Sequence, residues 1–418
     1  MKVTSSEKLP VKLWMENFTD MESGAWNQVK NLANFPFAFR HIAIMPDAHQ
    51  GYGMPIGGVM ATKNVIVPNA VGVDIGCGMC VVKTSLKKID VDILKKIMGE
   101  IRKAIPVGFK HHKEKQDESL MPKEFTNKGV YWCDGSCEPD TADTDLARST
   151  HLTDVVYNEW DNALTQIGTL GGGNHFIEIQ KGSDGYIWIM IHSGSRNLGF
   201  KVANHYNKLA VELNEKWGSA VPKSWELAFL PVDSKEGQAY IKEMRYCIDF
   251  ALANRKLMMD RICKIVESAC IPDYPESANI VFDKMINIAH NYAALENHFG
   301  QNVWVHRKGA TKATKGLTGI IPGSQGTNSY IVEGLGNRES FMSCSHGAGR
   351  KMGRKQAREN LDLKEELKKM EGIVHGIRSV KDLDEAPGSY KEIDKVMSNQ
   401  SDLVKILVEL TPLANMKG

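Results

Sequence analysis

The spacing of apolar residues predicts two long helices. Residues 243–270 carry apolar side chains at roughly i, i+3 and i+4 and contain no glycine or proline, which is the pattern of an amphipathic helix. A second helix is expected over 348–371, where a glycine-rich start is followed by RKMGRKQARENLDLKEELKKM. These two stretches account for most of the helix that the pattern predicts.

Short apolar runs separated by glycine predict the strands. Four runs lie at 41–47, 57–62, 64–76 and 80–86, and two more, flanked by glycine or serine, lie at 174–180 and 186–193. We expect a mixed α+β fold of β-sheets flanked by helices. No repeat, low-complexity tract or Pro/Ser-rich hinge divides the chain, so we expect one domain over residues 1–418. The polar residues 110–150 are expected to form a surface excursion or lid within it.

Composition excludes several classes of protein. The 418 residues include 52 Lys and Arg against 50 Asp and Glu, a formal net charge of +2, so a nucleic-acid site would have to be a local basic patch. The sequence has no apolar signal segment near its start and no run of about 18 apolar residues, which argues against secretion and a membrane span. The 8 cysteines therefore read as reduced thiols, and a cytoplasmic location is expected.

Reactive side chains gather beside glycine, serine and asparagine. They are His49, His175, His192, His290 and His346, together with Asp74 and Cys77 in VGVDIGCGMC. Glycine lets the backbone approach a ligand closely. Each residue alone has a structural explanation, such as a buried histidine or a turn carboxylate. Cys77 and Cys80 also have the spacing of a redox or zinc motif, with Cys133 and Cys137 as the nearest second pair.

The sequence resembles the RtcB family of RNA ligases over nearly its whole length. The motifs that carry the resemblance are PDAHQGYGMPIGG, NAVGVDIGCGM, GTLGGGNHFIEI, IHSGSRNLG, NIAHNYAALENH, VHRKGAT, IPGSQGTNSYIV, SCSHGAGR and PLANMKG, in this order. The resemblance implies an enzyme that joins RNA 3′-phosphate or 2′,3′-cyclic phosphate ends to 5′-hydroxyl ends, in RNA repair or tRNA splicing. It also implies a metal and nucleotide site in a central cleft.

The resemblance implies two Mn²⁺ ions. The family's ligands fall on Asp74, Cys77, His175, His192 and His290, with the thiolate able to bridge both ions. Ligand softness alone would favour Zn²⁺. Asp47 lies in a segment that the family places near the same site. We interpret it as a carboxylate that supports a ligand or handles a proton, with a turn-capping aspartate as the alternative.

The family's nucleophile falls on His346, which would take GMP from the co-substrate GTP. Gly347, Ala348 and Gly349 are expected to open a helix whose backbone N–H groups receive phosphate. The predicted nucleotide contacts are Asn174, Phe176, Glu178, Ser324, Ser329, Ala348, Gly349, Tyr390 and Lys417. Because guanine offers two donors where adenine offers an acceptor, Glu178 is expected to select GTP over ATP. Strand alternation puts His175 on the opposite face from 174, 176 and 178, so a local kink is also expected.

Positive charge beside the site predicts RNA contacts at Arg196, Lys308 and Arg350. Arg350, Arg354 and Arg358 would lie on one helix face and follow a nucleic-acid backbone, unless that face is simply solvated. A metal-dependent phosphodiesterase and a non-catalytic RNA-binding protein remain the competing hypotheses.

The sequence leaves several questions open. They are the physiological RNA, the oligomeric state, the need for an accessory activator protein, and the role of His111, His112, Cys133 and Cys137, which form either an accessory metal site or part of a lid.

Overall fold

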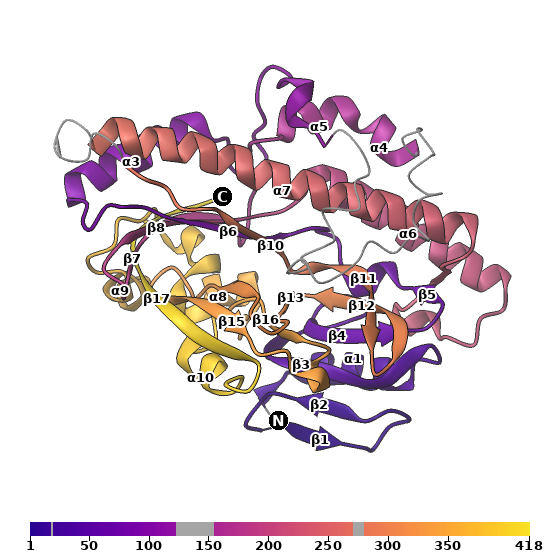
Figure 1. Ribbon diagram of the computed structural model, residues 1–418. Coiled ribbons are helices and arrows are strands. Elements are labelled where there is room, and N and C mark those ends of the chain that lie inside the picture. The colour runs from indigo at the N-terminus through magenta and orange to yellow at the C-terminus, as the bar shows by residue number, and fades with distance from the viewer. Residues whose placement is uncertain (18–19, 123–153, 271–279) are drawn as a thin grey trace.

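A computed structural model of the chain describes residues 1–17, 20–122, 154–270 and 280–418 (Figure 1). One of its two large sheets has six strands, and all neighbouring strands are antiparallel except β2 and β3. In spatial order they are β1 Lys2–Thr4, β2 Val11–Leu13, β3 Ala38–His49, β4 Ile56–Thr62, β12 Gln301–Lys308 and β11 Asn291–His298.

The other large sheet has seven strands, paired antiparallel throughout. In spatial order they are β10 Ile286–Ala289, β6 Gly78–Lys83, β8 Ile187–Ser193, β7 Phe176–Gly182, β17 Val404–Lys417, β15 Ser329–Gly334 and β14 Thr318–Ile321. Every residue of β8 is buried, as expected of a central strand. The strands predicted at 174–180 and 186–193 are confirmed as β7 and β8.

Two helices cover one face of the seven-stranded sheet. They are α7 Lys235–Cys270 and α3 Val91–Ala104, and Figure 1 shows α7 running across almost the whole molecule. Ile97 of α3 and Met258 of α7 share one apolar core with Ile189 of β8. The predicted helix 243–270 is confirmed, but α7 begins earlier. Its extra residues include Gly237, where a Cβ would lie 2.0 Å from a backbone oxygen of Pro231, so the glycine is needed at the helix start.

The remaining elements cover the ends and edges of the sheets. The helices are α1 Ser23–Asn34, α2 Pro68–Val71, α4 Asp154–Asn158, α5 Trp160–Gln166, α6 Arg196–Lys216, α8 Arg354–Asn360, α9 Leu363–Lys369 and α10 Ile393–Ser398. Short 3₁₀ helices lie at Glu118–Leu120, Lys223–Trp225, Arg338–Ser340, Val380–Glu385 and Pro387–Ser389. Two strand pairs complete the list: β5 Val65–Ile66 with β9 Leu230–Pro231, and β13 Ala310–Lys312 with β16 Ser343–Ser345.

Two predicted elements are wrong. The expected helix 348–371 is two short helices, α8 and α9, because the Asp362 side chain accepts a hydrogen bond from the backbone N–H of Glu365 and starts a new helix there. The expected strand 64–76 keeps only β5. Pro68 stands in the first turn of α2, where its missing N–H costs nothing, and the chain then turns toward Asp74.

The mixed α+β class is confirmed. Residues 110–122 of the predicted excursion are described, and residues 123–150 lie outside the described part of the chain, as do Cys133 and Cys137. Within the described ranges, no helix combines the length and the apolar character needed to cross a membrane.

The chain passes from one large sheet to the other through a single residue, His290. His290 stands between β10, the edge of the seven-stranded sheet, and β11, the edge of the six-stranded sheet. Its backbone N–H donates to the carbonyl of Cys77, and its own carbonyl accepts from Ala310. This junction places side chains from both sheets around one point.

Candidate metal and nucleotide site

Two groups of potential metal ligands share Cys77. Cys77, His192 and His290 form one group, and Asp74, Cys77 and His175 form the other, with the ligand atoms of each group within 4.8 Å of one another. The Cys77 sulfur lies 3.4 Å from Nε2 of His175 and 3.3 Å from Nε2 of His192. The five residues expected to bind metal are therefore brought together, with the thiol at their centre.

Strand register explains how separate motifs meet here. Met79 of β6 and Phe176 of β7 both pair with His192 of β8, so the residues just before β6 and β7 lie at the same end of the sheet as His192. Those residues are Cys77 and His175. A kink was expected because strand alternation would put His175 on the opposite face from Phe176 and Glu178. His175 in fact precedes the first residue of β7, so the turn before the strand accounts for its different direction.

A buried arginine fixes the loop that carries Cys77. Arg255 of α7 donates to the carbonyls of Gly76 and Ser193, at 3.0 and 2.7 Å. Asn291 donates to the carbonyl of Asp74, at 3.1 Å. These contacts hold the ends of β6 and β8 together before any ligand binds. Neither residue was expected at the site, because a polar side chain in a long helix or beside a strand has no distinctive motif.

Hydrogen bonds set the tautomers of two imidazoles. Nδ1 of His175 lies 3.0 Å from the carbonyl of Leu170, and Nδ1 of His192 lies 3.1 Å from the carbonyl of Asn174. A carbonyl can only accept, so each Nδ1 carries the proton and each Nε2 presents its lone pair toward Cys77. This is the orientation that a metal ligand requires.

The electrostatics of the donors fit divalent cations. Burial lowers the pKa of His192 and of His290 well below the usual value, which keeps both imidazoles neutral. Burial, with the nearby Asp74 carboxylate, raises the pKa of the Cys77 thiol. A cation between these donors would reverse that last effect and hold the thiolate. One thiolate, one carboxylate and three imidazoles in two overlapping groups fit two such ions.

His346 faces this centre from the other side. Its ring centroid lies 4.8 Å from that of His290. Its Nδ1 donates to Oδ2 of Asp47 at 2.6 Å, and its backbone N–H donates to the same oxygen at 3.2 Å. Asp47 is completely buried on β3. The carboxylate thus orients the imidazole and leaves Nε2 free to react, so the turn-capping interpretation of Asp47 is not needed.

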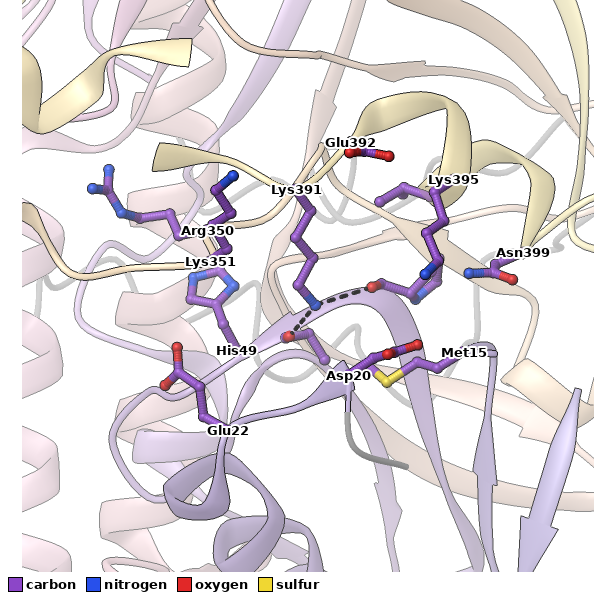
Figure 2. A pocket seen from close by; sticks show the side chains of 13 residues that line it. Met15, Asp20, Glu22, His49, Arg350, Lys351, Lys391, Glu392, Lys395 and Asn399 are labelled. Carbon is purple, nitrogen blue, oxygen red and sulfur yellow. Dashed lines mark hydrogen bonds between the residues drawn. The ribbon is translucent and has the colours of Figure 1, made fainter. Parts of the chain in front are cut away.

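The strand end that carries Asp47 is held on two sides. Gly349 has a φ of +73°, and a Cβ there would lie 2.1 Å from the Asp47 carbonyl oxygen, so only glycine fits. On the other side, the Lys391 ammonium donates to the carbonyls of Pro46 and Ala48, at 3.2 and 2.6 Å. Figure 2 shows Lys391 reaching across a pocket to this strand. Lys391 was not predicted, although it directly follows Tyr390.

The pocket beside Lys391 has a volume of about 210 Å³. Its lining combines acids and bases, including Asp20, Glu22, His49, Arg350, Lys351 and Lys395 (Figure 2). Lys395 is already paired with Glu16, at 2.9 Å. Burial lowers the pKa of His49 to about 4. The pocket lies behind the strand end that carries Asp47. We interpret it as part of the support of that strand and not as a separate ligand site.

Five of the predicted nucleotide contacts form one connected group. Lys417 lies 5.0 Å above the ring of Phe176 and 3.5 Å from the carbonyl of Asn174. Gln180 of β7 donates to both Glu178 and Ser329, at 2.7 and 3.1 Å. Burial raises the pKa of Glu178 to about 8, and burial also lowers the pKa of Lys417. An apolar ring, a carboxyl and an ammonium thus lie together on the neighbouring strands β7 and β17.

Glu385 organises the opposite side of this group, and sequence reasoning missed it. Its carboxylate lies 3.0 Å from Arg350, 2.8 Å from Arg354 and 3.9 Å from Lys417, and it accepts from the Tyr390 hydroxyl. Lys417, Arg350 and the hydrogen bonds from Tyr390 and Arg354 outweigh burial and lower the pKa of Glu385. Its position in DEAPGSY, five residues before the assigned Tyr390, was the available signal.

The loop after His346 contradicts one prediction. Residues 347–349 do not open a helix, because α8 begins only at Arg354 and Arg350 forms a bridge with Tyr390 instead. The predicted arginine stripe is wrong for the same reason. Arg354 and Arg358 lie on α8 and pair with Glu385 and Asp384.

The remaining nucleotide candidates lie close to this loop. Ser324 bonds with Thr327, at 2.9 Å, and Ala348 donates its backbone N–H to the carbonyl of Pro322.

The predicted RNA contacts have different surroundings. Arg196 bonds to Thr169 and to the carbonyl of Gly108, beside His175. Lys308 is buried, and its ammonium donates to the carbonyls of Tyr52 and Asn69, at 2.5 and 3.0 Å. Burial lowers its pKa to about 7. Arg196 thus lies beside a metal-ligand candidate, since it and His175 both pack closely against Gly171.

The structure also shows the surroundings of Cys80 and of His112, which the sequence left open as ligands of another metal site. Cys80 lies in the apolar core with its sulfur toward the carbonyl of Arg255, and it belongs to neither ligand group in the described structure. His112 contacts Arg261, at 3.2 Å. A Cys77–Cys80 zinc or redox motif is therefore not supported by the geometry.

Comparisons with known proteins agree with this geometry. Residues 28–418 match the family described as "tRNA-splicing ligase RtcB". The RNA-splicing ligase RtcB of Escherichia coli K12 is 36% identical, covering 100% of this chain and 99% of the relative. The tRNA-splicing ligase RtcB of Thermococcus kodakarensis is 32% identical, covering 94% and 90%. The RNA-splicing ligase RtcB of Mycobacterium tuberculosis is also 32% identical, covering 94% and 100%. With this coverage and this donor geometry, the chain belongs to the RtcB family.

Proposed function

We propose that this protein is a GTP-dependent RNA ligase that joins RNA 3′-phosphate or 2′,3′-cyclic phosphate ends to 5′-hydroxyl ends, in RNA repair or tRNA splicing. The observation that carries the proposal is the position of His346, oriented by Asp47 and 4.8 Å, ring to ring, from the metal-ligand candidate His290. Relatives named as RNA-splicing or tRNA-splicing ligases support the reaction class.

The two groups of donors that share Cys77 would each hold one divalent ion, and we propose Mn²⁺. When bound, such ions supply positive charge to phosphoryl oxygens and lower the pKa of the attacking oxygen. The chain's own contribution is to fix the donors in advance, through the carbonyl-bound Nδ1 atoms of His175 and His192.

His346 would then carry the guanylyl group. Its Nε2 attacks the α-phosphorus of GTP, a P–N bond forms, and pyrophosphate leaves. The proton on Nδ1 stays in the hydrogen bond to Asp47, which stabilises the positive imidazolium that results. An oxygen of the RNA 3′-phosphate next attacks the same phosphorus, the P–N bond breaks, and His346 returns to its neutral form.

The product of that exchange is an RNA 3′-ppG end. The 5′-hydroxyl oxygen of the second RNA attacks the 3′-phosphorus, GMP leaves, and the hydroxyl proton is released as the phosphodiester forms. A 2′,3′-cyclic end enters after water opens it to the 3′-phosphate. Each step replaces one P–O or P–N bond by another, so the protein mainly positions the groups and screens their charge.

Guanine selection is assigned to Glu178 and Lys417. A buried carboxylate can accept from both N1–H and the 2-amino group of guanine, whereas adenine would face it with a lone pair. Lys417 can donate to guanine O6 or N7, and Phe176 can pack against the base. Glu178 and Phe176 are both buried at the end of β7, where water cannot substitute for the missing partner.

The test is covalent labelling. The protein is incubated with α-labelled GTP and Mn²⁺ and then denatured, and an acid-labile, alkali-stable protein–GMP adduct is expected. His346→Ala should abolish it, while the control His205→Ala, an exposed histidine on α6, should label like the parent. A protein that hydrolyses cyclic phosphate without forming an adduct would instead be a metal-dependent phosphodiesterase, and the proposal would be wrong.

A further inference from the structure

Phe109 is a completely exposed phenylalanine close to the metal ligands. A ring of this size is normally buried, because removing it from water is strongly favourable. Phe109 stands at the tip of a tight turn, where Lys110 donates its backbone N–H to the carbonyl of Val107, at 3.2 Å. Phe109 is therefore exposed although its turn is hydrogen-bonded. The mechanism proposed above gives this side chain no role.

The turn is attached directly to the metal-ligand loop. Gly108 donates its backbone N–H to the carbonyl of Gly171, at 2.8 Å, and Val107 forms a parallel bridge with the same glycine. Gly171 in turn is packed so closely against His175 and Arg196 that a Cβ there would lie 2.6 and 2.2 Å from their side-chain nitrogens. Gly171 thus links the two: it is hydrogen-bonded to the Phe109 turn, and it packs against the metal-ligand candidate His175.

Several cations lie on or near the turn that carries Phe109. Arg196 donates to the carbonyl of Gly108, at 3.4 Å. Arg354 reaches Gly173 in the same loop, where a Cβ would lie 2.4 Å from its Nη2. Lys110 and Lys113 follow Phe109 in sequence, and both are exposed. Positive charge that follows the phosphates, combined with an aromatic face for the bases, is the arrangement by which proteins bind single-stranded nucleic acid.

We propose that Phe109 stacks on a base near the RNA end that is joined, and so holds single-stranded RNA against the metal centre. The ring offers no hydrogen-bonding group, so it can accept any base, as repair of varied ends requires. This inference rests on the proposed RNA ligase function, and it adds a substrate-binding residue that acts on the base rather than on the phosphate.

The experiment measures RNA binding without GTP, so that no ligation occurs. The probes are short single-stranded RNAs with a 3′-phosphate or a 5′-hydroxyl end, each carrying 2-aminopurine at one of the three terminal positions. Binding to the full-length protein with Mn²⁺ should change the emission of 2-aminopurine at one position. Phe109→Ala should remove that change and weaken the Kd about tenfold. Tyr157→Ala, at a residue of α4 that is 68% exposed, is the matched control and should bind like the parent.

A second variant and an altered RNA test whether the effect comes from stacking of Phe109 on a base. Phe109→Trp should retain the affinity, and the emission of its added indole, obtained by subtracting the spectrum of the parent with its 8 tryptophans, should change when RNA is added. An abasic site at the position whose emission changes should weaken binding to the parent but not to Phe109→Ala, since the stacking partner is already missing.

Three results would overturn the inference. They are an unchanged Kd for Phe109→Ala, a difference spectrum between Phe109→Trp and the parent that is already blue-shifted without RNA because protein covers the ring, and equal loss from the abasic site in parent and variant. A protein that forms the His346 adduct but shows any of these results would keep the ligase proposal and lose only this one.

Discussion

The metal side and the nucleotide side of the site differ in how their charges are satisfied. On the metal side, a thiol, a carboxylate and three imidazoles converge in two ligand groups around Cys77. On the nucleotide side, Arg350, Arg354 and Lys417 all lie within 4 Å of the single carboxylate of Glu385. The first region is a set of donors that needs cations, whereas the second already pairs its cations with a carboxylate and keeps an excess of positive charge.

This contrast indicates two different ways of preparing for a ligand. The metal donors are held by backbone carbonyls and by Arg255, so binding an ion requires little rearrangement. The cations around Glu385 must share their contacts when phosphates arrive, because each guanidinium has a limited number of donors. We therefore expect substitutions on the metal side to abolish activity, and those on the nucleotide side to change affinity and pH dependence.

The largest effect is expected from Cys77→Ala. Both ligand groups lose their shared member, so the bound metal should fall below one ion per chain, and self-guanylylation should slow by at least about 10³-fold. Metal content by mass spectrometry and the labelling rate test this expectation. Cys80→Ala is the matched control, because Cys80 is also buried, lies three residues further along the chain on β6, and faces the apolar core. Two ions retained by Cys77→Ala would contradict a bridging thiolate.

An intermediate effect is expected from Glu178→Gln. The amide offers only one acceptor to guanine, so the KM for GTP should rise about 10–100-fold at pH 8, with a smaller preference over ATP. The parent's KM should fall as pH rises toward 8, because burial raises the pKa of Glu178 to about 8 and guanine needs the ionised carboxylate. The variant's KM should not follow this change.

The same carboxyl group should make the stability of the folded protein depend on pH in a definite direction. Its folded pKa of about 8 lies above its ordinary value of 4.5, so the folded state binds the proton more tightly than the unfolded state. That contribution is present below about pH 4.5 and is lost as pH rises through 8. Melting temperature should therefore fall more steeply over this interval in the parent than in Glu178→Gln. Parallel curves for the two proteins would rule out the raised pKa.

The smallest effect is expected from Lys391→Met. This change removes both donors that hold the carbonyls beside Asp47, so the alignment of Asp47 with His346 should loosen and self-guanylylation should slow about tenfold. The expected change is in kcat with a nearly constant KM for GTP, since the nucleotide contacts are untouched. Lys391→Arg should recover part of the rate. A change confined to KM would mean that Lys391 serves the nucleotide instead.

Sequence patterns predicted which side chains lie together better than they predicted the local secondary structure. The resemblance placed all five metal-ligand candidates, and they meet because their glycine-flanked motifs lie at strand ends in register. The helix expected over 348–371 was wrong because one capping aspartate, Asp362, outweighs a long run of good helix formers. Glu385 and Lys391 were missed because their roles come from contacts with distant segments, and no spacing along the chain signals such contacts.

The position of His290 has a consequence for how the two layers behave as a unit. It is the single residue between a strand of one sheet and a strand of the other, and it is also a member of a ligand group. A relative displacement of the layers would pull its imidazole away from Cys77 and His192. Metal binding would therefore depend on the correct relative position of the two sheets. Bound ions would in turn oppose a displacement of one sheet against the other.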